Sequence, residues 1–131
     1  MEVITKSAQE TAALGEKIAN QLIINHRSSI IALTGELGSG KTVFVQGLAK
    51  GLGLKERILS PTFVMVRSYA LCAMLYSTFF HVDLYRIENE KDIESLGLEE
   101  IWSDPKNIVA IEWAEKIKKI LPKKRVDIHF K

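Results

Sequence analysis

The chain carries the octapeptide GELGSGKT at residues Gly35–Thr42, which matches the pattern G-x-x-x-x-G-K-[ST] at every fixed position. Gly38 and Gly40 allow the backbone to wrap so that successive N–H groups point inward and form an anion-binding nest. A helix that begins near Lys41 adds the positive end of its dipole. The lysine of such a loop reaches the β- and γ-phosphates of a nucleotide, and the hydroxyl of Thr42 is placed to bind Mg²⁺. The octapeptide therefore predicts a phosphate-binding site.

The sequence on both sides of the octapeptide supports this interpretation. The run Ser29–Leu33 is short and continuously apolar, as in a strand that is buried on both faces of a parallel sheet. After the loop, residues 43–52 carry apolar side chains at helical spacing, and Gly53 follows. The order of strand, loop and helix argues against a glycine-rich turn that matches by coincidence. Within the loop, Glu36 is expected to be an ordinary exposed carboxylate.

The remaining patterns predict alternating strands and helices. Ser7 and Glu10 form a capping-box pattern at the start of an amphipathic helix that extends to about Leu22. Further elements are expected at Ile58–Leu59 (extended), Phe63–Tyr69 and Leu75–Leu84 (antiparallel strands), Asn89–Leu96 (helix ended by Gly97), Asn107–Ile111 (strand), Ala114–Leu121 (helix ended by Pro122) and Val126–Phe130 (edge strand). This order predicts an α/β fold with a mixed, mainly parallel sheet in one domain over residues 1–131.

Composition and charge exclude several classes of protein. The chain has 131 residues, of which 47% are hydrophobic and 26% charged, as in a globular domain. A net charge of +2 excludes a general electrostatic field for nucleic acid or membranes. A single cysteine, Cys72, excludes an intramolecular disulfide framework and suits a reducing compartment. Zinc is not expected, because the three histidines are far apart in sequence and no cysteine pair accompanies them.

No segment has the features of a membrane span or a secretory leader. The most apolar region, Phe63–Val82, is interrupted by Arg67 and His81, and its uninterrupted parts are too short to cross a bilayer. The first ten residues lack a basic start followed by an apolar run. We therefore expect a soluble, cytoplasmic protein.

Two carboxylates follow apolar runs and are candidates for chemistry at the loop. Asp83 can hold Mg²⁺ through its water shell, as a Walker B acid does, or it can be a capping or salt-bridge acid, for example with Arg86. Glu112 follows a predicted buried strand, where α/β sheets gather their ligands, and can position water or contact the metal. The alternative is an acid at a helix start. Trp113 is either a core residue or a stacking wall beside the site.

Two further segments have both a functional and an ordinary interpretation. Thr62, in the segment Ser60–Thr62, stands where P-loop switch proteins carry a threonine that senses the γ-phosphate; alternatively, Pro61 ends a turn before a strand. A basic run near the C-terminus is typical of a solvated helix face, and an RNA or protein contact is the alternative. It comprises Lys116, Lys118, Lys119, Lys123, Lys124 and Arg125.

The succession of these motifs resembles the TsaE family, formerly YjeE, of small bacterial P-loop ATPases. The shared segments are Thr11 with Leu14-Gly15, the octapeptide, SPTF at Ser60–Phe63, HVDLYR at His81–Arg86 and IEWAE at Ile111–Glu115. The resemblance implies a P-loop NTPase fold and an ATPase subunit that uses ATP and Mg²⁺. Such a subunit acts with TsaD and TsaB, which make threonylcarbamoyladenosine at position 37 of tRNA.

The loop and the resemblance together imply a set of site residues. Catalytic roles fall to Lys41, Thr62, Asp83 and Glu112, metal contacts to Thr42, Asp83 and Glu112, and nucleotide contacts to Thr11, Gly35, Leu37, Gly38, Ser39, Gly40, Lys41, Thr42, Val43 and Trp113. Thr11 is expected near the base, and Arg86 is expected to be structural. The segment Ser68–Phe80 departs from the family pattern, because it is more apolar and lacks turn residues; apolar surface exposed there would favour a partner contact.

Two other functions use the same loop. A small-molecule kinase needs an acceptor pocket and an arginine-rich lid, and the chain is short for both and has no arginine cluster. A nucleotide-sensing module whose hydrolysis is incidental is the third possibility. No guanine-reading Asn-Lys-x-Asp segment is present, and adenine has no comparable short signature.

Overall fold

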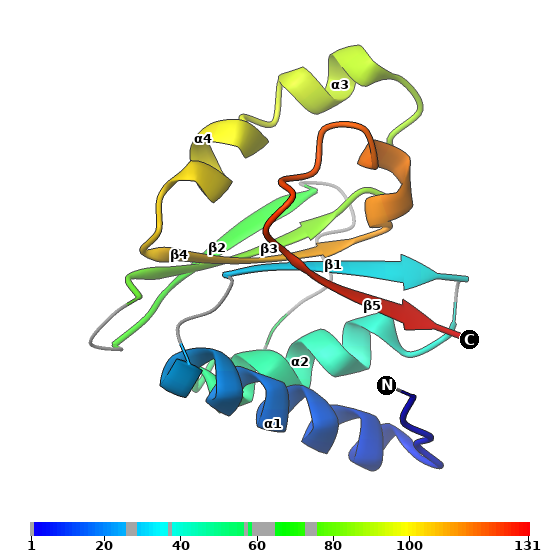
Figure 1. Ribbon diagram of the computed structural model, residues 1–131, viewed down its shortest axis with the longest axis vertical. Helices are drawn as coiled ribbons and strands as arrows, with labels where there is room; N and C mark the ends of the chain where they lie inside the picture. The colour runs from blue at the N-terminus through cyan, green and yellow to red at the C-terminus, as the bar shows by residue number, and fades with distance from the viewer. Residues whose placement is uncertain (1, 26–28, 37, 57, 59–64, 73–75) are drawn as a thin grey trace.

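A five-stranded sheet with helices on both faces forms the centre of the chain (Figure 1). The computed structural model describes residues 2–25, 29–36, 38–56, 58, 65–72 and 76–131. The strands are β1 (Ile30–Gly35), β2 (Val66–Ala70), β3 (Thr78–Asp83), β4 (Asn107–Glu112) and β5 (Val126–Phe130), and the sheet order is β2-β3-β4-β1-β5. Strand β1 pairs parallel with β4 and β5, β3 pairs parallel with β4, and only β2 runs antiparallel. The predicted α/β fold with a mixed, mainly parallel sheet is confirmed.

The helices divide between the two faces of the sheet. Helices α1 (Ala8–Asn25) and α2 (Lys41–Gly51) cover one face, and α3 (Glu90–Glu94), α4 (Leu98–Ser103) and the 3₁₀ turn η1 (Ala114–Ile117) lie over the other (Figure 1). Helices α1 and α2 approach closely because each has a glycine at the contact. A Cβ on Gly47 would lie 1.9 Å from the carbonyl oxygen of Ala12, and one on Gly15 would lie 2.3 Å from that of Phe44. This contact holds the helix that follows the GELGSGKT loop.

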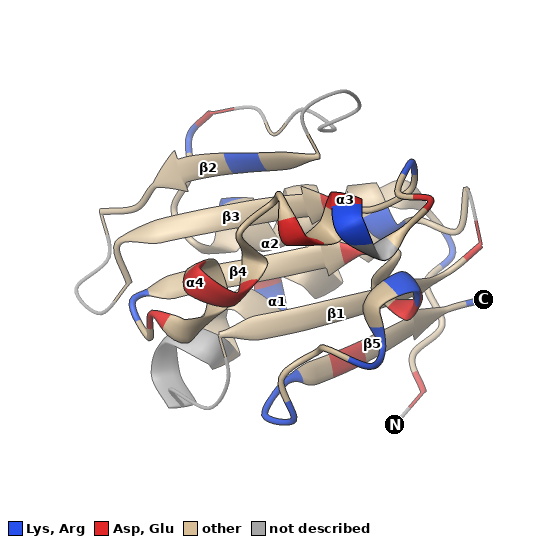
Figure 2. Cartoon of the chain, turned by 90° about the horizontal axis from the view of Figure 1, so that it is seen from above, with Lys and Arg blue, Asp and Glu red and all other residues tan. Residues whose placement is uncertain are grey.

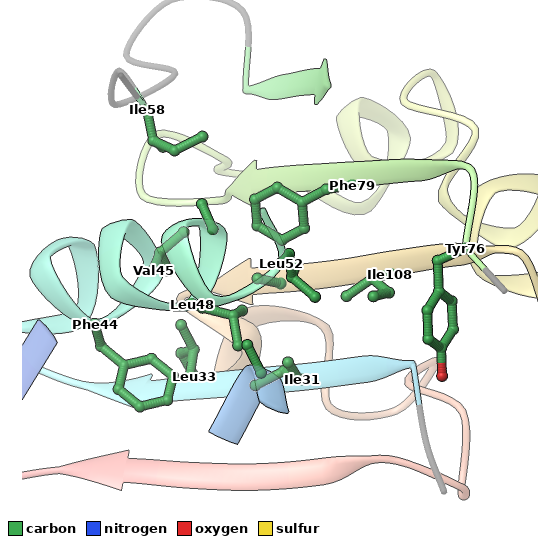
Figure 3. Close-up of a cluster of buried hydrophobic side chains, with 13 residues drawn as sticks. Ile31, Leu33, Phe44, Val45, Leu48, Leu52, Ile58, Tyr76, Phe79 and Ile108 are labelled. Carbon is green, nitrogen blue, oxygen red and sulfur yellow. The ribbon is translucent and has the colours of Figure 1, made fainter. Parts of the chain in front are cut away.

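Strand β1 lies between two clusters of buried side chains, as its continuous apolar run predicts. On one face, Phe44 and Leu48 of α2 pack towards Ile31 and Leu33 (Figure 3). On the other face, Ala32 joins the cluster beneath α3, α4 and η1. Full burial of a side chain such as Phe44 stabilises the fold by roughly 1.5–3 kcal/mol. The end of β1, where the loop begins, is therefore fixed from both sides.

The predicted boundaries are wrong in two places on the α3, α4 and η1 face. The helix expected over Ala114–Leu121 is only a 3₁₀ turn that ends at Ile117, and turn residues follow up to Ile120, whose side chain is 53% exposed. The helix expected over Asn89–Leu96 ends already at Glu94, and Gly97 is the N-cap of α4, which the sequence did not predict. The φ of Gly97, 66°, lies in the left-handed region, which glycine adopts readily.

Other local expectations are confirmed, with small differences. The capping pattern is present: the N–H of Glu10 donates to Ser7 Oγ at 3.1 Å, and the Glu10 carboxylate accepts from the N–H of Lys6 at 2.9 Å. Of the expected extended piece, Ile58 is buried and belongs to no strand, and Leu59 lies outside the described residues.

In its described residues, 68–72 and 76–80, the segment Ser68–Phe80 does not expose the large apolar side chains that its sequence suggests. Its two strands form the expected antiparallel pair, and Tyr69 stacks on Phe79 with ring centroids 6.2 Å apart. Tyr76 and Phe79 are buried, and no large apolar side chain of this segment, in its described part, is exposed. The described residues therefore give no support to an exposed apolar contact here. No helix in the described ranges is both long and apolar enough to cross a membrane.

Candidate active site

The GELGSGKT loop joins the end of β1 to the start of α2 and depends on glycine at two positions. Gly38 has φ 77° and Gly40 has φ 104°, values that side chains rarely allow. A Cβ on Gly38 would meet no atom within 4 Å, so backbone conformation, and not space, requires glycine there. Gly40 is the N-cap of α2, and no side chain caps this helix end. The free N–H groups at the start of α2 thus remain available to an anion.

Lys41 is the buried cation of the loop. Its side chain is 4% exposed, and Nζ donates to the carbonyl oxygens of Gly35 and, at 2.8 Å, of Glu36. The ammonium also lies 4.2 Å from the centre of the Trp113 ring, which is within the range of a cation–π contact. Among the described residues it forms no ion pair. A buried ammonium held only by dipoles and a ring leaves its charge for an anionic ligand to neutralise.

Asp83 and Glu112 come to the same edge of the sheet as the loop. They end β3 and β4, which run parallel, and they are direct partners in the register of these strands. Glu112 also pairs with Leu33 in β1, two residues before Gly35. The carboxyl ends of parallel strands form the ligand-binding edge of an open α/β sheet. Two acids that are 29 residues apart in sequence therefore lie side by side next to the loop.

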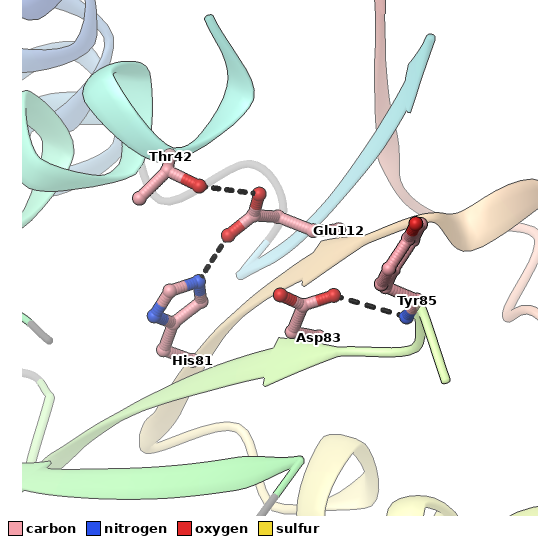
Figure 4. Close-up of polar contacts among 5 residues, drawn as sticks. All are labelled: Thr42, His81, Asp83, Tyr85 and Glu112. Atoms are coloured by element: carbon pink, nitrogen blue, oxygen red, sulfur yellow. Dashed lines mark hydrogen bonds and ion pairs between the residues drawn. The ribbon is translucent and has the colours of Figure 1, made fainter. Parts of the chain in front are cut away.

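Glu112 is linked to the loop by a direct hydrogen bond (Figure 4). Thr42 Oγ1 donates to Glu112 Oε1 at 2.9 Å, and the other carboxylate oxygen, Oε2, lies 2.5 Å from His81 Nε2. Glu112 is 2% exposed and His81 is fully buried. The hydroxyl of Thr42 and the carboxylate of Glu112, both expected at the site, are therefore hydrogen-bonded to each other, and His81 contacts the same carboxylate.

A cavity of about 410 Å³ brings most of the predicted residues together. It is lined by Gly38, Ser39, Gly40, Lys41, Thr42, Val43, Asp83, Glu112 and Trp113, together with Tyr85 and Arg86. Asp83 and Glu112 thus face the loop and not opposite sides of the molecule. The proposed metal ligands are near one another, which is the geometry that a magnesium–phosphate site needs.

Trp113 stands between this cavity and a second one. It lines the first cavity and also a space of about 650 Å³ beside Gly35, Glu36, Phe130 and the C-terminal residues. Its φ of 61° is unusual for a side chain of this size, and such strain is concentrated at functional sites. The half-buried indole is thus a wall of both cavities as well as a neighbour of the core on the η1 face.

Thr11 lies beside the loop without lining either cavity. The position of a Cβ on Gly40 would be 3.7 Å from Thr11 Cγ2 and 4.0 Å from Phe130 Cδ2. The Thr11 hydroxyl bonds the Thr5 hydroxyl at 2.7 Å. Gly35 lines the second cavity. Its carbonyl oxygen accepts a hydrogen bond from Lys41, and its N–H donates to the Glu115 carboxylate at 3.2 Å.

Two predicted residues lie outside the described part of the chain. These are Thr62, the expected switch threonine, and Leu37 of the loop. Their expected contacts stay predictions. Glu36 is exposed, as expected.

Several residues of the site were not predicted. His81 precedes Asp83 by two positions in β3, and the two-residue period of a strand places both on the same face; that period was the available signal. Tyr85 and Arg86 line the cavity, although Arg86 was expected to have only a structural role. Lys116 Nζ donates to the carbonyl oxygens of Tyr85, at 2.5 Å, and of Ile87, at 3.1 Å. It thereby ties the segment after Asp83 to the segment after Glu112.

The basic run is not one solvated helix face. Lys116 is engaged as described, and Arg125 donates to Asp127 and to the Pro122 carbonyl, both within 3 Å. Lys118, Lys119 and Lys123 are exposed on the turns before β5, where Figure 2 shows blue segments. An RNA or protein contact by these lysines stays a prediction.

The pKa of Asp83 is raised above its ordinary value of 3.8, chiefly because burial penalises the charged form. The Tyr85 N–H, which donates to Asp83 at 3.0 Å, opposes this effect, and the Glu112 carboxylate adds to it. The protonated carboxyl therefore stabilises the fold fully below about pH 3.8, and this stabilisation is lost as the pH rises through the folded-state pKa. At neutral pH, the charge of Asp83 opposes folding.

We expect Asp83→Asn to raise the melting temperature of the nucleotide-free protein at pH 7 while weakening its Mg²⁺-dependent nucleotide binding. The gain in melting temperature should shrink as the pH falls through the folded-state pKa of Asp83, because the wild-type carboxyl then becomes protonated. Thermal unfolding across a pH series measures this effect. Asp104→Asn is the matched control, because exposed Asp104 accepts an N–H two residues on, from Lys106, in the same way. A lower melting temperature of Asp83→Asn at every pH would contradict the assignment.

The residues present suit a magnesium ion that also has phosphate ligands. In the described ranges, no group of three or more His, Cys, Asp or Glu side chains is arranged to hold a metal alone. Mg²⁺ in nucleotide sites is usually held by one or two carboxylates together with phosphate oxygens and water. The hydroxyl of Thr42 and the carboxylates of Asp83 and Glu112, gathered at one cavity, are donors of the required kind.

Comparisons with known proteins agree with this geometry. The family model described as "Threonylcarbamoyl adenosine biosynthesis protein TsaE" matches residues 5–131. A Treponema pallidum protein named "tRNA threonylcarbamoyladenosine biosynthesis protein TsaE" is 37% identical over 128 residues, covering 98% of this chain and 89% of that protein. A Bacillus subtilis protein of the same name is 34% identical, covering 97% of this chain and 75% of its own length.

A solved structure supports the same assignment. The crystal structure of Bacillus subtilis YdiB superposes with a TM-score of 0.71 at 30% identity, covering 95% of this chain and 72% of that one. The chain belongs to the TsaE family and has its P-loop NTPase fold.

Proposed function

We propose that this chain binds ATP with Mg²⁺ and hydrolyses it as a partner-regulated subunit in the biosynthesis of threonylcarbamoyladenosine at tRNA position 37. The observation that carries the proposal is the meeting of Lys41, Thr42, Asp83 and Glu112 at one cavity. In P-loop enzymes these residue types bind phosphate, hold the metal and orient the attacking water. Membership of the TsaE family supports the assignment to threonylcarbamoyladenosine biosynthesis, and the geometry of the cavity supports the hydrolysis of a nucleotide.

Each residue has a role that its contacts suit. The N–H groups of Gly38–Thr42 bind phosphate oxygens, and Lys41 leaves its carbonyl partners for the β- and γ-phosphates. Thr42 and Asp83 would hold Mg²⁺, which when bound neutralises charge on these phosphates. Glu112 orients the water whose oxygen bonds to the γ-phosphorus as the bridge to ADP breaks; phosphate and a proton are released.

The base and ribose have fewer candidate contacts. Thr11 lies beside Gly40, on the β5 side of the loop, and Trp113 offers an aromatic face between the two cavities. We propose that these two residues contact the nucleoside, while Thr62 senses the γ-phosphate. ATP is the nucleotide that the family relation favours.

We expect this chain to hydrolyse ATP slowly alone and faster with the TsaB–TsaD complex, on which it acts as a nucleotide-dependent switch. The test mixes the chain with TsaB–TsaD and tRNA, with ATP or a non-hydrolysable analogue, and counts modified tRNA per complex. Many turnovers with ATP and arrest with the analogue are expected.

Three outcomes would contradict the proposal in distinct ways. Equal turnover with the analogue would favour a nucleotide-sensing module. A phosphorylated small molecule in place of free phosphate would favour a kinase. Full modification without this chain would remove it from the pathway.

A further inference from the structure

His81 is a fully buried polar side chain to which the proposed phosphate and metal chemistry assigns no task. It lies in the interior of β3 and contacts the carboxylate of Glu112 in β4. Both strands are covered on both faces by the two buried clusters. A buried polar group needs a partner, and here the partner is the candidate catalytic acid.

The hydrogen bonds divide the two oxygens of Glu112 between two donors (Figure 4). Oε1 accepts from Thr42 at 2.9 Å, and Oε2 lies 2.5 Å from His81 Nε2. The opposite ring nitrogen of His81, Nδ1, is buried and has no partner among the described residues. A protonated Nδ1 would leave an N–H without an acceptor, whereas a bare Nδ1 leaves only a lone pair unused. This geometry fits a neutral ring with its proton on Nε2, donated to Glu112.

We propose that His81 is a positioning residue that fixes the Glu112 carboxylate through Oε2. The proposal rests on the proposed ATPase function and adds to it the means by which Glu112 is oriented. If Mg²⁺ binds a lone pair of the Thr42 hydroxyl, the O–H can still donate to Oε1, and His81 would hold Oε2, so that each oxygen of the carboxylate has a donor and the carboxylate cannot rotate. Oε1 then stays directed into the cavity, where it can orient water instead of becoming a further metal ligand.

Kinetics of two His81 variants test the consequence. His81→Leu removes the donor, so kcat should fall about 10- to 100-fold, as is usual when a hydrogen-bond partner of a site ligand is lost. The dissociation constant for ATP should stay within about threefold, because His81 does not line the cavity. His81→Gln places an amide N–H near the Nε2 position and should restore most of kcat.

A double variant separates action through Glu112 from a general effect on folding. If His81 acts only through Glu112, adding His81→Leu to Glu112→Gln should change kcat by less than about twofold. Asn107→Ala is the structural control. It removes a buried hydrogen bond, to the Ile101 carbonyl, at the other end of β4, about 16 Å from Glu112. It should lower the melting temperature but not kcat.

A measurement on the nucleotide-free protein tests the contact itself. In protein labelled with ¹⁵N-histidine, long-range ¹H–¹⁵N spectra should show His81 with its proton on Nε2 at neutral pH. The signal is assigned by its loss in His81→Gln and should shift in Glu112→Gln. A proton on Nδ1, or full activity and affinity of His81→Leu, would overturn the inference. A correct tautomer in a wild-type chain without ATPase activity, alone or with TsaB–TsaD, would reject the proposed function and show that the contact is structural.

Discussion

Lys41→Ala is expected to weaken ATP binding by about 100-fold or more. Each hydrogen bond between a charged donor and phosphate contributes about 1.5–3 kcal/mol, and a lysine that reaches both the β- and the γ-phosphate would form two of them. In the nucleotide-free protein Nζ bonds only neutral oxygens and the Trp113 ring, so the variant should lose affinity with little loss of fold stability. Isothermal titration calorimetry with a non-hydrolysable analogue measures the change.

Lys50→Ala is the matched control for this variant. Lys50 lies in the last turn of the same helix, α2, and is exposed. Its loss removes a charge favourable to the helix C-terminus, worth about 0.3–1 kcal/mol of stability, without touching the loop. If Lys41→Ala bound ATP as tightly as Lys50→Ala, the GELGSGKT loop would not be the phosphate site.

Glu112→Gln is expected to lower kcat about 100- to 1,000-fold with ATP affinity changed by less than about threefold, because the amide cannot act as a base towards water. The folded structure should tolerate the change. The amide oxygen can accept from the Nε2–H of His81, and the amide N–H can donate to the Thr42 hydroxyl, which can accept as well as donate. Single-turnover measurement of phosphate release separates the chemical step from binding.

The control for Glu112→Gln is Glu100→Gln, an exposed carboxylate on α4. Both variants lose one negative charge, but only Glu112→Gln alters a side chain that contacts Thr42. The comparison therefore separates the effect of charge from the effect of that contact. A Glu112→Gln variant with unchanged single-turnover rate would move the catalytic role to another residue, of which Asp83 is the nearest candidate at the same cavity.

Local sequence patterns predicted the order of the elements around the loop well. The apolar run of β1, the glycines of the loop and the spacing of α2 depend on contacts between near neighbours, which the sequence records directly. Around Gly97 the prediction failed: α3 already ends at Glu94, and Gly97 is the N-cap of α4, a helix that the sequence did not predict. The expected helix over Ala114–Leu121 is a 3₁₀ turn that ends at Ile117, although Ala114, Ile117 and Leu121 do pack against the core, so an apolar spacing alone did not tell a single turn from a longer helix.

By itself, the amino-acid order determined the phosphate loop, the strand–helix alternation and the two candidate acids, because short-range chirality, capping and hydrophobic periodicity depend only on residues a few positions apart. Only the tertiary structure decided that Thr42, His81 and Glu112 form one hydrogen-bonded group. Those residues are up to 70 positions apart, and their contact follows from the parallel register of β3 with β4 and of β4 with β1. That register arises from packing of the whole sheet between its two layers of helices.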